Sequence, residues 1–271
     1  MPEAPSLTVF APTLLAGKTA LVTGGGSGLG RAIAWALAAA GADLLLAARR
    51  TDRLETAARE IADATERRVE PAFVNIRERE AVEALGETAD RLYGGIDILV
   101  NNAGGQFPQP ARDFKPKGWH AVIDTNLNGT WHMTQVFGRR MLEGSGGAIC
   151  QIIAVVGRGF PGIAHSAAAR AGVLELARTL AYEWGPKVRV NCVAPGPVRT
   201  AGFDATYDAE TVDMLVGSRI PRPVSAEAVA HAVVFLSSQA AEYINGEVLY
   251  VADGQQCHGR NQALLDHDFE I

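Results

Sequence analysis

The chain has 271 residues, of which 48% are hydrophobic and 20% charged, a balance that suits one large domain with a buried core. Its formal net charge of -5 argues against nucleic acid or an anionic membrane surface as a partner. Three widely spaced cysteines do not indicate a disulfide framework, and the six histidines show no metal-ligand spacing, so we expect no metal.

The two ends of the chain carry no recognisable targeting segment. The N-terminal MPEAPSLTVFAP has no basic stretch followed by a long apolar run, as a secretory signal would. No apolar run reaches the ~20 residues of a membrane span, and the final DFEI is not a peroxisomal address. We therefore expect a cytoplasmic protein with an irregular N-terminal arm over residues 1–16 and a C-terminal tail over residues 254–271.

Short runs rich in leucine and β-branched residues alternate with alanine-rich segments along the whole chain. The runs are almost continuously apolar, which is typical of strands buried on both faces of a parallel sheet. The predicted strands are 19–23, 43–47, 69–75, 96–102, 147–154, 188–194 and 247–251. Segments between them, such as RAIAWALAAAG and RTDRLETAAREIADAT, have helical patterns.

This alternation predicts an α/β fold: a doubly wound, Rossmann-type parallel sheet flanked by helices. No internal repeat, linker or change of composition divides the chain, so residues 1–271 are expected to form a single domain. Residues 200–222 are irregular and flanked by prolines. We expect this segment to form a mobile flap over a substrate pocket.

The first predicted strand leads into a glycine-rich turn, TGGGSGLG, which is followed by a helical pattern. Glycine at the spacing T-G-x-x-x-G-x-G permits a tight turn, and the N-terminus of the helix presents unpaired N–H groups to a pyrophosphate. The turn therefore predicts a dinucleotide site, although a glycine-rich turn without a ligand is the alternative. The residues expected to contact the dinucleotide here are Gly24, Gly26, Ser27, Gly28, Leu29 and Gly30.

The second predicted strand is followed by Arg49 and Arg50, in the region where a site for NAD usually carries an acid. An arginine pair without an acid suits a 2′-phosphate, both by charge and by the planar donor geometry of guanidinium. We therefore expect NADP(H) as the cofactor, with Arg49 as the main contact. The alternative is that both arginines begin a solvated helix.

With these residues in view, the chain resembles the short-chain dehydrogenase/reductase family from about Leu14 to Gly254. The motifs are TGGGSGLG, NNAG at 101–104, DTNLNGT at 124–130, HSAAARAG at 165–172 and NCVAPGPVRT at 191–200. The resemblance implies a homodimer or homotetramer. It also implies further cofactor contacts, namely Asn75 and Ile76 at the adenine, Asn102, Ala103 and Gly104 at the adenosine end, and Pro195, Gly196, Val198 and Thr200 at the nicotinamide.

Two longer stretches carry a narrower resemblance. NNAGGQFPQPARDFKPKGWHAVIDTNLNGTWHM and GFPGIAHSAAARAGV are similar to peroxisomal trans-2-enoyl-CoA reductases and, more distantly, to 2,4-dienoyl-CoA reductases. That subgroup uses NADPH to reduce a carbon–carbon double bond conjugated to a thioester. The resemblance therefore implies an acyl thioester or another activated alkene as the small-molecule substrate.

Three of the four catalytic positions that the wider family implies (Asn, Ser, Tyr, Lys) are changed. Asn126 matches the first, but Ala154 stands at the serine position, Ser166 at the tyrosine position and Arg170 at the lysine position. Serine is a far weaker acid than tyrosine, and arginine does not readily shuttle a proton. Ordinary carbonyl reduction, which needs a positioned acid, should therefore be poor.

Reduction of a conjugated double bond makes a different demand on the site. Charge develops on the thioester oxygen, which needs hydrogen-bond donors rather than immediate protonation. Ser166 and Arg170 are four residues apart and share one face of a predicted helix. We expect Ser166 to donate to this oxygen, Arg170 to hold the nicotinamide ribose, and Asn126 to complete the catalytic set. The proton donor is not identified, since Leu174 stands where related enoyl reductases can have a tyrosine.

Two other functions stay open. An alcohol/aldehyde dehydrogenase or ketoreductase of the same family would need an acid that the sequence does not show. A catalytically silent NADP-binding protein or a non-redox biosynthetic enzyme would explain the changed catalytic positions, although Arg49 and Asn126 indicate that cofactor geometry is kept. His165 is a further candidate proton donor, but a histidine beside a helix start is more often structural.

Overall fold

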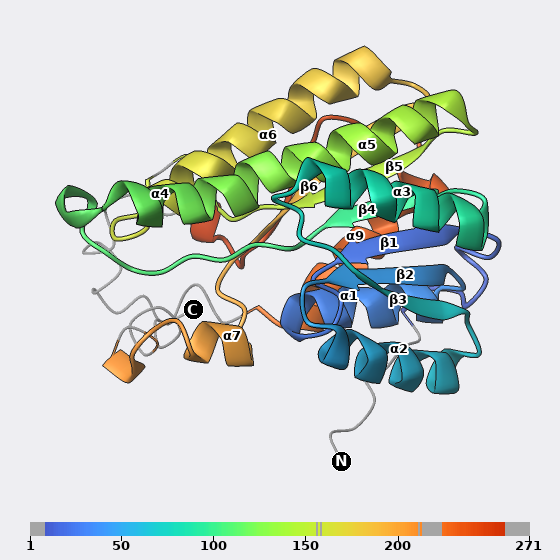
Figure 1. Cartoon of the computed structure of the whole chain (residues 1–271), viewed down its shortest axis with the longest axis horizontal. Helices are drawn as coiled ribbons and strands as arrows, with labels where there is room; N and C mark the ends of the chain where they lie inside the picture. The colour runs from blue at the N-terminus through green and yellow to red at the C-terminus, as the bar shows by residue number, and fades with distance from the viewer. Residues whose placement is uncertain (1–8, 156, 158, 211, 213–223, 258–271) are drawn as a thin grey trace, which may run out of the picture.

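The computed structural model describes residues 9–155, 157, 159–210, 212 and 224–257 (Figure 1). The strands are β1 Thr19–Thr23, β2 Asp43–Ala48, β3 Val69–Phe73, β4 Ile98–Asn101, β5 Gly147–Ile152, β6 Val188–Pro195 and β7 Val248–Val251. They form one parallel sheet in the order β3-β2-β1-β4-β5-β6-β7, which confirms the predicted fold class. Each predicted strand is present, with ends within two residues of the prediction.

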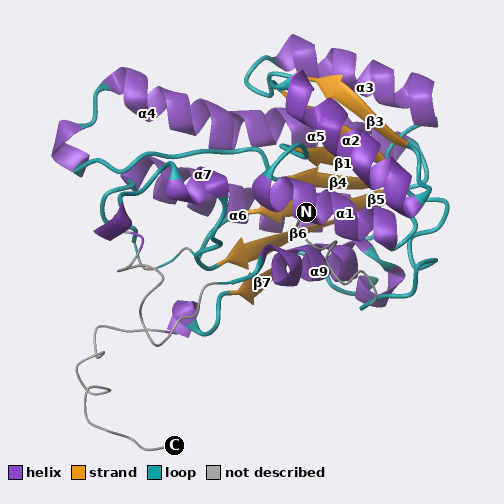
Figure 2. Cartoon of the chain, turned by 90° about the horizontal axis from the view of Figure 1, so that it is seen from below, coloured by secondary structure: helices purple, strands orange, loops and turns teal. Residues whose placement is uncertain are grey.

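The main helices are α1 Gly28–Ala39, α2 Thr51–Thr65, α3 Arg79–Tyr93, α4 Pro116–Ile123, α5 Thr130–Glu143, α6 Ala164–Trp184, α7 Ala201–Asp204 and α9 Ala226–Ser237. Residues of α1, α2 and α9 pack in one buried core on one face of the sheet. Residues of α3, α5 and α6 pack in a second core on the other face, so the sheet is the middle of three layers (Figure 1 and Figure 2).

Successive residues of a strand enter opposite cores. Leu44 and Leu46 of β2 belong to the core beneath α1, whereas Leu45 belongs to the core beneath α3, and all three are fully buried. Burying one leucine side chain contributes roughly 1.5–3 kcal/mol. This two-sided burial explains why the strands are apolar without alternation.

The sheet changes direction between β1 and β4, and this is where the site lies. From β1 the chain builds outward to β3, and it then crosses back to β4 and builds toward β7. Open parallel sheets form a crevice at the carboxyl ends of the strands at such a point. Thr23 joins the two strand ends here, since its Oγ1 accepts hydrogen bonds from the backbone N–H groups of Asn102 and Ala103, each at 3.0 Å.

The predicted arm, flap and tail are only partly within the described residues. The arm is described from residue 9, the flap over residues 200–210 and 212, and the tail up to residue 257. The described part of the flap contains α7, a short helix whose first turn is capped by Thr200 Oγ1, which accepts from the backbone N–H of Phe203 at 3.2 Å. In the described parts of the chain, no helix combines the length and apolar character that crossing a membrane requires. The cytoplasmic location stays a prediction.

Candidate active site

The turn between β1 and α1 requires glycine for two different reasons. Gly24 has a φ of 70°, a left-handed conformation that favours glycine. A Cβ on Gly30 would lie 2.3 Å from the carbonyl oxygen of Gly24 and 2.5 Å from Nδ2 of Asn102. The first turn of α1 therefore packs directly on the turn before it, and the helix N-terminus lies beside a cavity that Gly26 and Ser27 line.

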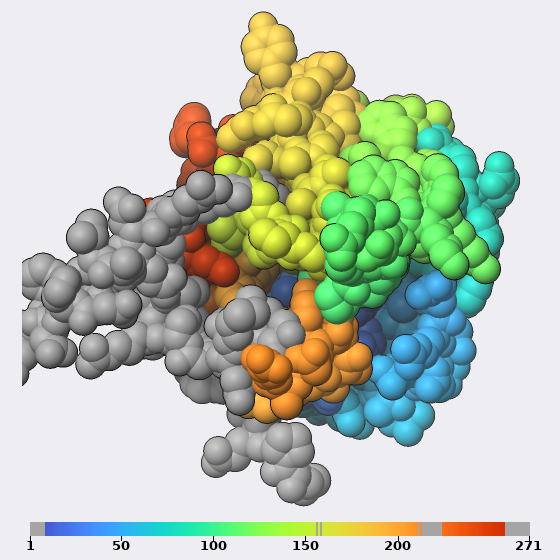
Figure 3. Space-filling model, turned by 90° about the vertical axis from the view of Figure 1, so that its left-hand side faces the viewer, coloured from blue at the N-terminus to red at the C-terminus, as the bar shows by residue number. Residues whose placement is uncertain are grey.

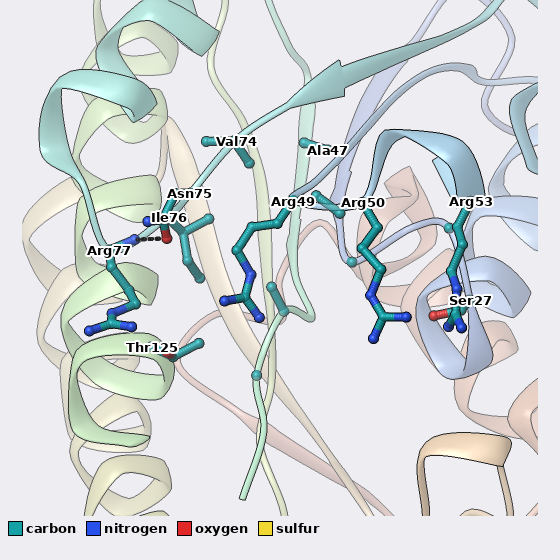
Figure 4. A pocket seen from close by; sticks show the side chains of 15 residues that line it. Ser27, Ala47, Arg49, Arg50, Arg53, Val74, Asn75, Ile76, Arg77 and Thr125 are labelled. Atoms are coloured by element: carbon teal, nitrogen blue, oxygen red, sulfur yellow. Dashed lines mark hydrogen bonds between the residues drawn. The ribbon is translucent and has the colours of Figure 1, made fainter. Parts of the chain in front are cut away.

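This first cavity, which we call the arginine cavity, lies at the ends of β1, β2 and β3 (Figure 4). Four arginines line it, and no aspartate or glutamate is among its lining residues. Arg49 and Arg50 extend side by side into the same space, as Figure 4 shows. The predicted cofactor residues that line it are Gly24, Gly26, Ser27, Arg49, Arg50, Asn75, Ile76, Ala103 and Gly104.

The sequence analysis missed the other two arginines of this cavity. Arg53 lies in the first turn of α2, three residues after Arg50, and Arg77 directly follows Ile76. Arg77 also lies 3.9 Å from a carboxylate oxygen of Asp124. The helical spacing of Arg50 and Arg53 was a usable signal for Arg53. Nothing in the sequence placed Arg77 in the same cavity as the arginines that follow β2.

A second cavity, which we call the reaction cavity, has a volume of about 610 Å³ and lies between the start of α6 and α7. In Figure 3 the yellow residues near the start of α6 and the orange residues around α7 flank a hollow with blue N-terminal residues at its base. The predicted site residues that line it are Leu29, Asn102, Gly104, Ser166, Arg170, Pro195, Gly196, Val198 and Thr200. Gly104 lines both cavities, so they adjoin.

Three predicted site residues line neither cavity: Gly28, Gly30 and Asn126. Gly28 packs against Thr200, whose Cβ would lie 3.6 Å from a Cβ at that position. Asn126 is fully buried in a π-helical turn, Asp124–Gly129, that joins α4 to α5. π-helical turns are frequent at functional sites.

Asn126 fixes the backbone of the loop after β4. Its Oδ1 accepts from the N–H of Gly105 and its Nδ2 donates to the carbonyl of the same residue, both at 2.9 Å. The carboxamide thus satisfies both backbone groups of Gly105 at once, which holds the loop in one conformation. Asn126 is therefore placed to position this loop rather than to contact a substrate in the reaction cavity.

Arg170 brings a partly buried positive charge to the reaction cavity. Its Nη1 donates to the carbonyl oxygen of Ile152 at 2.6 Å, and a Cβ on Gly104 would lie 2.5 Å from Nη2. Burial lowers the pKa of the guanidinium to about 10, so it stays charged at neutral pH. Among the described residues no carboxylate forms an ion pair with it.

Ser166 does not direct its proton into the cavity as predicted. Its hydroxyl donates to Oε1 of Gln106 at 2.7 Å, and Nε2 of Gln106 donates to the hydroxyl oxygen of Tyr207 at 2.6 Å. These three residues, which we call the Ser166–Gln106–Tyr207 chain, all line the reaction cavity. Ala154 lines it as well and places a methyl group where the resemblance implies a serine hydroxyl. The cavity thus has a tyrosine in its lining, but this tyrosine comes from the segment that was predicted to form a flap.

This architecture matches known proteins along most of the chain. A family model described as enoyl-(acyl carrier protein) reductase matches residues 24–256. The peroxisomal 2,4-dienoyl-CoA reductase of Danio rerio is 36% identical over 251 residues, which cover 91% of this chain and 83% of that protein. The chain belongs to the short-chain dehydrogenase/reductase family. Its predicted membership is confirmed.

Other members of the short-chain dehydrogenase/reductase family differ in their chemistry. A 3-oxoacyl-[acyl-carrier-protein] reductase of Chlamydia muridarum is 35% identical over 89% of this chain and 98% of its own. A gluconate 5-dehydrogenase of Burkholderia cenocepacia, solved in complex with NADP and tartrate, superposes with a TM-score of 0.85 and is 32% identical, covering 92% of this chain and 98% of that one. Family membership therefore establishes a nicotinamide-dependent oxidoreductase architecture without selecting the substrate.

The short-chain dehydrogenase/reductase fold of this chain contains one more unusual feature, at the start of α6. His165 is fully buried between Phe107 and Phe114, with ring centroids 4.7 Å and 4.4 Å away. Burial lowers the pKa of the imidazole, and its Nε2 has no hydrogen-bond partner among the described residues. His165 does not line the reaction cavity, so the structure offers no path for it as a proton donor.

Gln106 and Tyr207 were the functional candidates that the sequence analysis missed. The GGQF stretch that contains Gln106 was noted only as part of a resemblance, and Tyr207 lies in the segment expected to be a flap. The two residues are 101 positions apart. Their pairing with Ser166 depends on three segments meeting in space, which no spacing rule reveals.

Proposed function

We propose that this protein uses NADPH to reduce the carbon–carbon double bond of an enoyl or dienoyl thioester. The observation that carries the proposal is the composition of the reaction cavity, which offers Arg170 and a chain of hydroxyl and amide groups. Helix α6 contains no lysine, and its one tyrosine, Tyr182, is 92% exposed near the far end. The cavity therefore suits stabilisation of charge on an oxygen better than proton transfer from an α6 tyrosine.

The arginine cavity supports NADPH rather than NADH. Its glycine turn and the N-terminus of α1 suit a pyrophosphate, and Asn75 and Ile76 would flank the adenine. Arg49 and Arg50 would hold the 2′-phosphate, with Arg53 and Arg77 adding positive charge. The absence of an acid among the lining residues removes the group that usually accepts from an unmodified ribose.

The proposed reaction places charge where the protein can stabilise it. A nicotinamide cofactor held by the arginine cavity would supply a hydride for the far end of the conjugated system, and negative charge would then develop on the thioester carbonyl oxygen. Hydrogen-bond donors in the reaction cavity stabilise the resulting enolate oxygen, and the fixed charge of Arg170 favours negative charge nearby. A proton from water then adds at the α-carbon, so that the hydride supplies both electrons and one hydrogen and water supplies the second hydrogen.

A ketoreductase is the second candidate, because the Chlamydia muridarum relative is named as one and is similar along its whole length. Carbonyl reduction requires a proton on oxygen, and a positioned acid contributes roughly 10²–10⁴-fold to such reactions. Ala154 after β5 and Ser166 and Arg170 on α6 replace the residues that would provide this acid. A silent NADP-binding protein is the third candidate.

Steady-state oxidation of NADPH tests the three candidates together. We expect turnover with crotonyl-CoA or sorbyl-CoA and at least tenfold lower kcat/KM with acetoacetyl-CoA. Faster reduction of acetoacetyl-CoA would replace the proposal by a ketoreductase. Binding of NADPH, followed by its fluorescence, without turnover of any of the three thioesters would support the silent binder instead.

We also propose a homodimer or homotetramer, as family membership suggests. Tyr182 and Tyr243 are 92% and 94% exposed. The segments that carry them adjoin, since Nδ2 of Asn245 donates to the carbonyl of Ala181 at 2.8 Å. Large exposed aromatic side chains are typical of interfaces, and light scattering of the purified chain would give the subunit number.

A further inference from the structure

In the Ser166–Gln106–Tyr207 chain, each hydrogen bond is donated in the direction of Tyr207. Ser166 has one hydroxyl proton, and it is used on Oε1 of Gln106 at 2.7 Å. The amide nitrogen of Gln106 then donates to the oxygen of Tyr207 at 2.6 Å. Because the phenol oxygen accepts in this pair, the proton of Tyr207 is not used within the chain, and no described residue accepts it.

The hydroxyl group of Tyr207, whose proton is accepted by no residue that the structure describes, lines the reaction cavity. Tyr207 follows α7, and its half-buried ring packs on Phe203, with ring centroids 4.9 Å apart. The segment around α7, to which Tyr207 belongs, lies on the other side of the hollow from the start of α6, the helix that carries Arg170 (Figure 3). A thioester held between these two elements would therefore meet a fixed cation from one and a phenol donor from the other.

We infer that Tyr207, rather than Ser166, donates the hydrogen bond to the thioester oxygen of the substrate, and that Gln106 and Ser166 orient it for this task. The inference rests on the proposed function and names its oxygen-stabilising residue. Tyr207 is thus the catalytic residue, whereas Gln106 and Ser166 are positioning residues. The flap supplies the donor that α6 has lost.

The acidity of the hydroxyl groups in the Ser166–Gln106–Tyr207 chain favours Tyr207 as the donor to the substrate oxygen. A phenol with an ordinary pKa of about 10 is a much better donor than an aliphatic hydroxyl. Burial raises the pKa of Tyr207, and the hydrogen bond from Gln106 opposes that rise because it stabilises negative charge on the phenol oxygen. As charge builds on the substrate oxygen, polarisation can therefore spread through Tyr207 to the amide of Gln106.

Gln106 is held in place from both of its neighbours. Gly105 is fixed by the two hydrogen bonds of Asn126, and Phe107 packs edge-on against the buried ring of His165. The loop between β4 and α4 is thus anchored to the π-helical turn on one side and to α6 on the other. This anchoring sets where the amide of Gln106 lies before any substrate arrives, as preorganised donors require.

The experiment measures the hydrogen bond to oxygen separately from turnover. Sorbyl-CoA absorbs in the near ultraviolet, and a hydrogen bond to its carbonyl oxygen shifts that band to longer wavelength. With NADP⁺ bound, so that no hydride is available, we expect the shift in the wild-type protein and its loss in Tyr207→Phe, which keeps the ring contact with Phe203. With NADPH, kcat should fall about 10²–10³-fold in this variant, as for loss of one oxyanion donor.

Gln106→Glu tests the direction of the chain. A carboxylate of nearly the same shape can accept hydrogen bonds from both Ser166 and Tyr207 but cannot donate one. The hydroxyl of Tyr207 would therefore donate to this carboxylate instead of to the substrate. We expect this variant to lose the spectral shift although Tyr207 is present, and to recover activity at acid pH, where the protonated carboxyl can donate again. Ser166→Ala should weaken the shift only partly. Tyr250→Phe, the same change at a position that lines neither cavity, should leave both readouts unchanged.

The outcomes separate the inference from the proposed function. If wild-type protein turns over sorbyl-CoA and Tyr207→Phe keeps both the shift and kcat within threefold, the inference is overturned and the function stands. If Gln106→Glu retains the full shift, the assigned polarity is wrong. If the wild-type protein neither shifts nor reduces any conjugated thioester, the proposed function itself fails, and the role of Tyr207 fails with it.

Discussion

The arginine cavity and the reaction cavity adjoin at Gly104, but they are built in opposite ways. The first is lined by side chains that act side by side, since Arg49 and Arg50 extend into one space from consecutive positions (Figure 4). The second depends on side chains that hold one another, as in the Ser166–Gln106–Tyr207 chain. Losses of binding free energy caused by substitutions in the arginine cavity should therefore add. In the reaction cavity, a small displacement of one side chain should disturb several groups together.

Gly104→Ala should reduce the reaction rate most, because one methyl group would disturb both Arg170, which lines the reaction cavity, and Asn126, which fixes the loop after β4. The new Cβ would lie 2.5 Å from Nη2 of Arg170 and 3.0 Å from Oδ1 of Asn126. Misplacing catalytic groups by about 1 Å can cost roughly 10²-fold in rate. We expect kcat with sorbyl-CoA to fall by about that factor.

The next residue provides the control for this variant. A Cβ on Gly105 would meet no atom within 4 Å, and neither glycine has a positive φ. Gly105→Ala should therefore keep kcat within about threefold of the wild type. Equal losses in the two variants would show that the loop itself, and not the contact of residue 104 with Arg170, limits the reaction.

Substitutions in the arginine cavity should weaken cofactor binding by intermediate factors, and the effect of each arginine can be measured separately. Arg49→Ala and Arg50→Ala should each weaken NADPH binding by about 10–100-fold, the equivalent of one or two charge-assisted hydrogen bonds. Binding of NADH should change little, because it carries no 2′-phosphate. Isothermal titration gives both dissociation constants, and Arg59→Ala, at an exposed position of α2 outside the cavity, is the control.

The double variant tests the side-by-side arrangement directly. If Arg49 and Arg50 act independently, the loss of binding free energy in the double variant should be the sum of the two single losses. A double variant no worse than either single one would mean that the two side chains act as one unit. In that case the contrast between the two cavities would disappear.

The sequence predicts the arginine cavity better than the reaction cavity for a physical reason. The glycine turn and Arg49 lie directly after strands β1 and β2, and parallel neighbouring strands end at the same edge of the sheet. Local position was therefore enough to bring them together. Gln106, Ser166 and Tyr207 come from a loop, a helix and the flap, so their meeting depends on tertiary packing that periodicity does not encode.

Two residues illustrate what sequence patterns leave open even where they identify the right position. The motif around Asn126 predicted a catalytic residue, but Asn126 lines neither cavity, and the π-helical turn aims its carboxamide at Gly105. The spacing of Ser166 and Arg170 predicted one shared helix face, and both residues line the reaction cavity. The direction of the Ser166 hydroxyl was set by Gln106, 60 residues away in the sequence.

The smallest predicted effect concerns how the reaction cavity is supported. His165 is buried between Phe107 and Phe114 and has a lowered pKa, so the folded protein resists binding a proton there. The unfolded chain binds that proton near the ordinary value of about 6.5. The stability that the neutral ring contributes is therefore present above about pH 6.5 and is lost as the pH falls below it.

Thermal unfolding between pH 7 and pH 5 should reveal this contribution. We expect the wild type to lose more stability on acidification than His165→Phe, which places an apolar ring in the same aromatic cluster and has nothing to protonate. His120→Phe, at an exposed position of α4, should follow the wild-type pH dependence. If His165→Phe also follows it, another group sets the acid sensitivity, and the aromatic cluster supports Gln106 by packing alone.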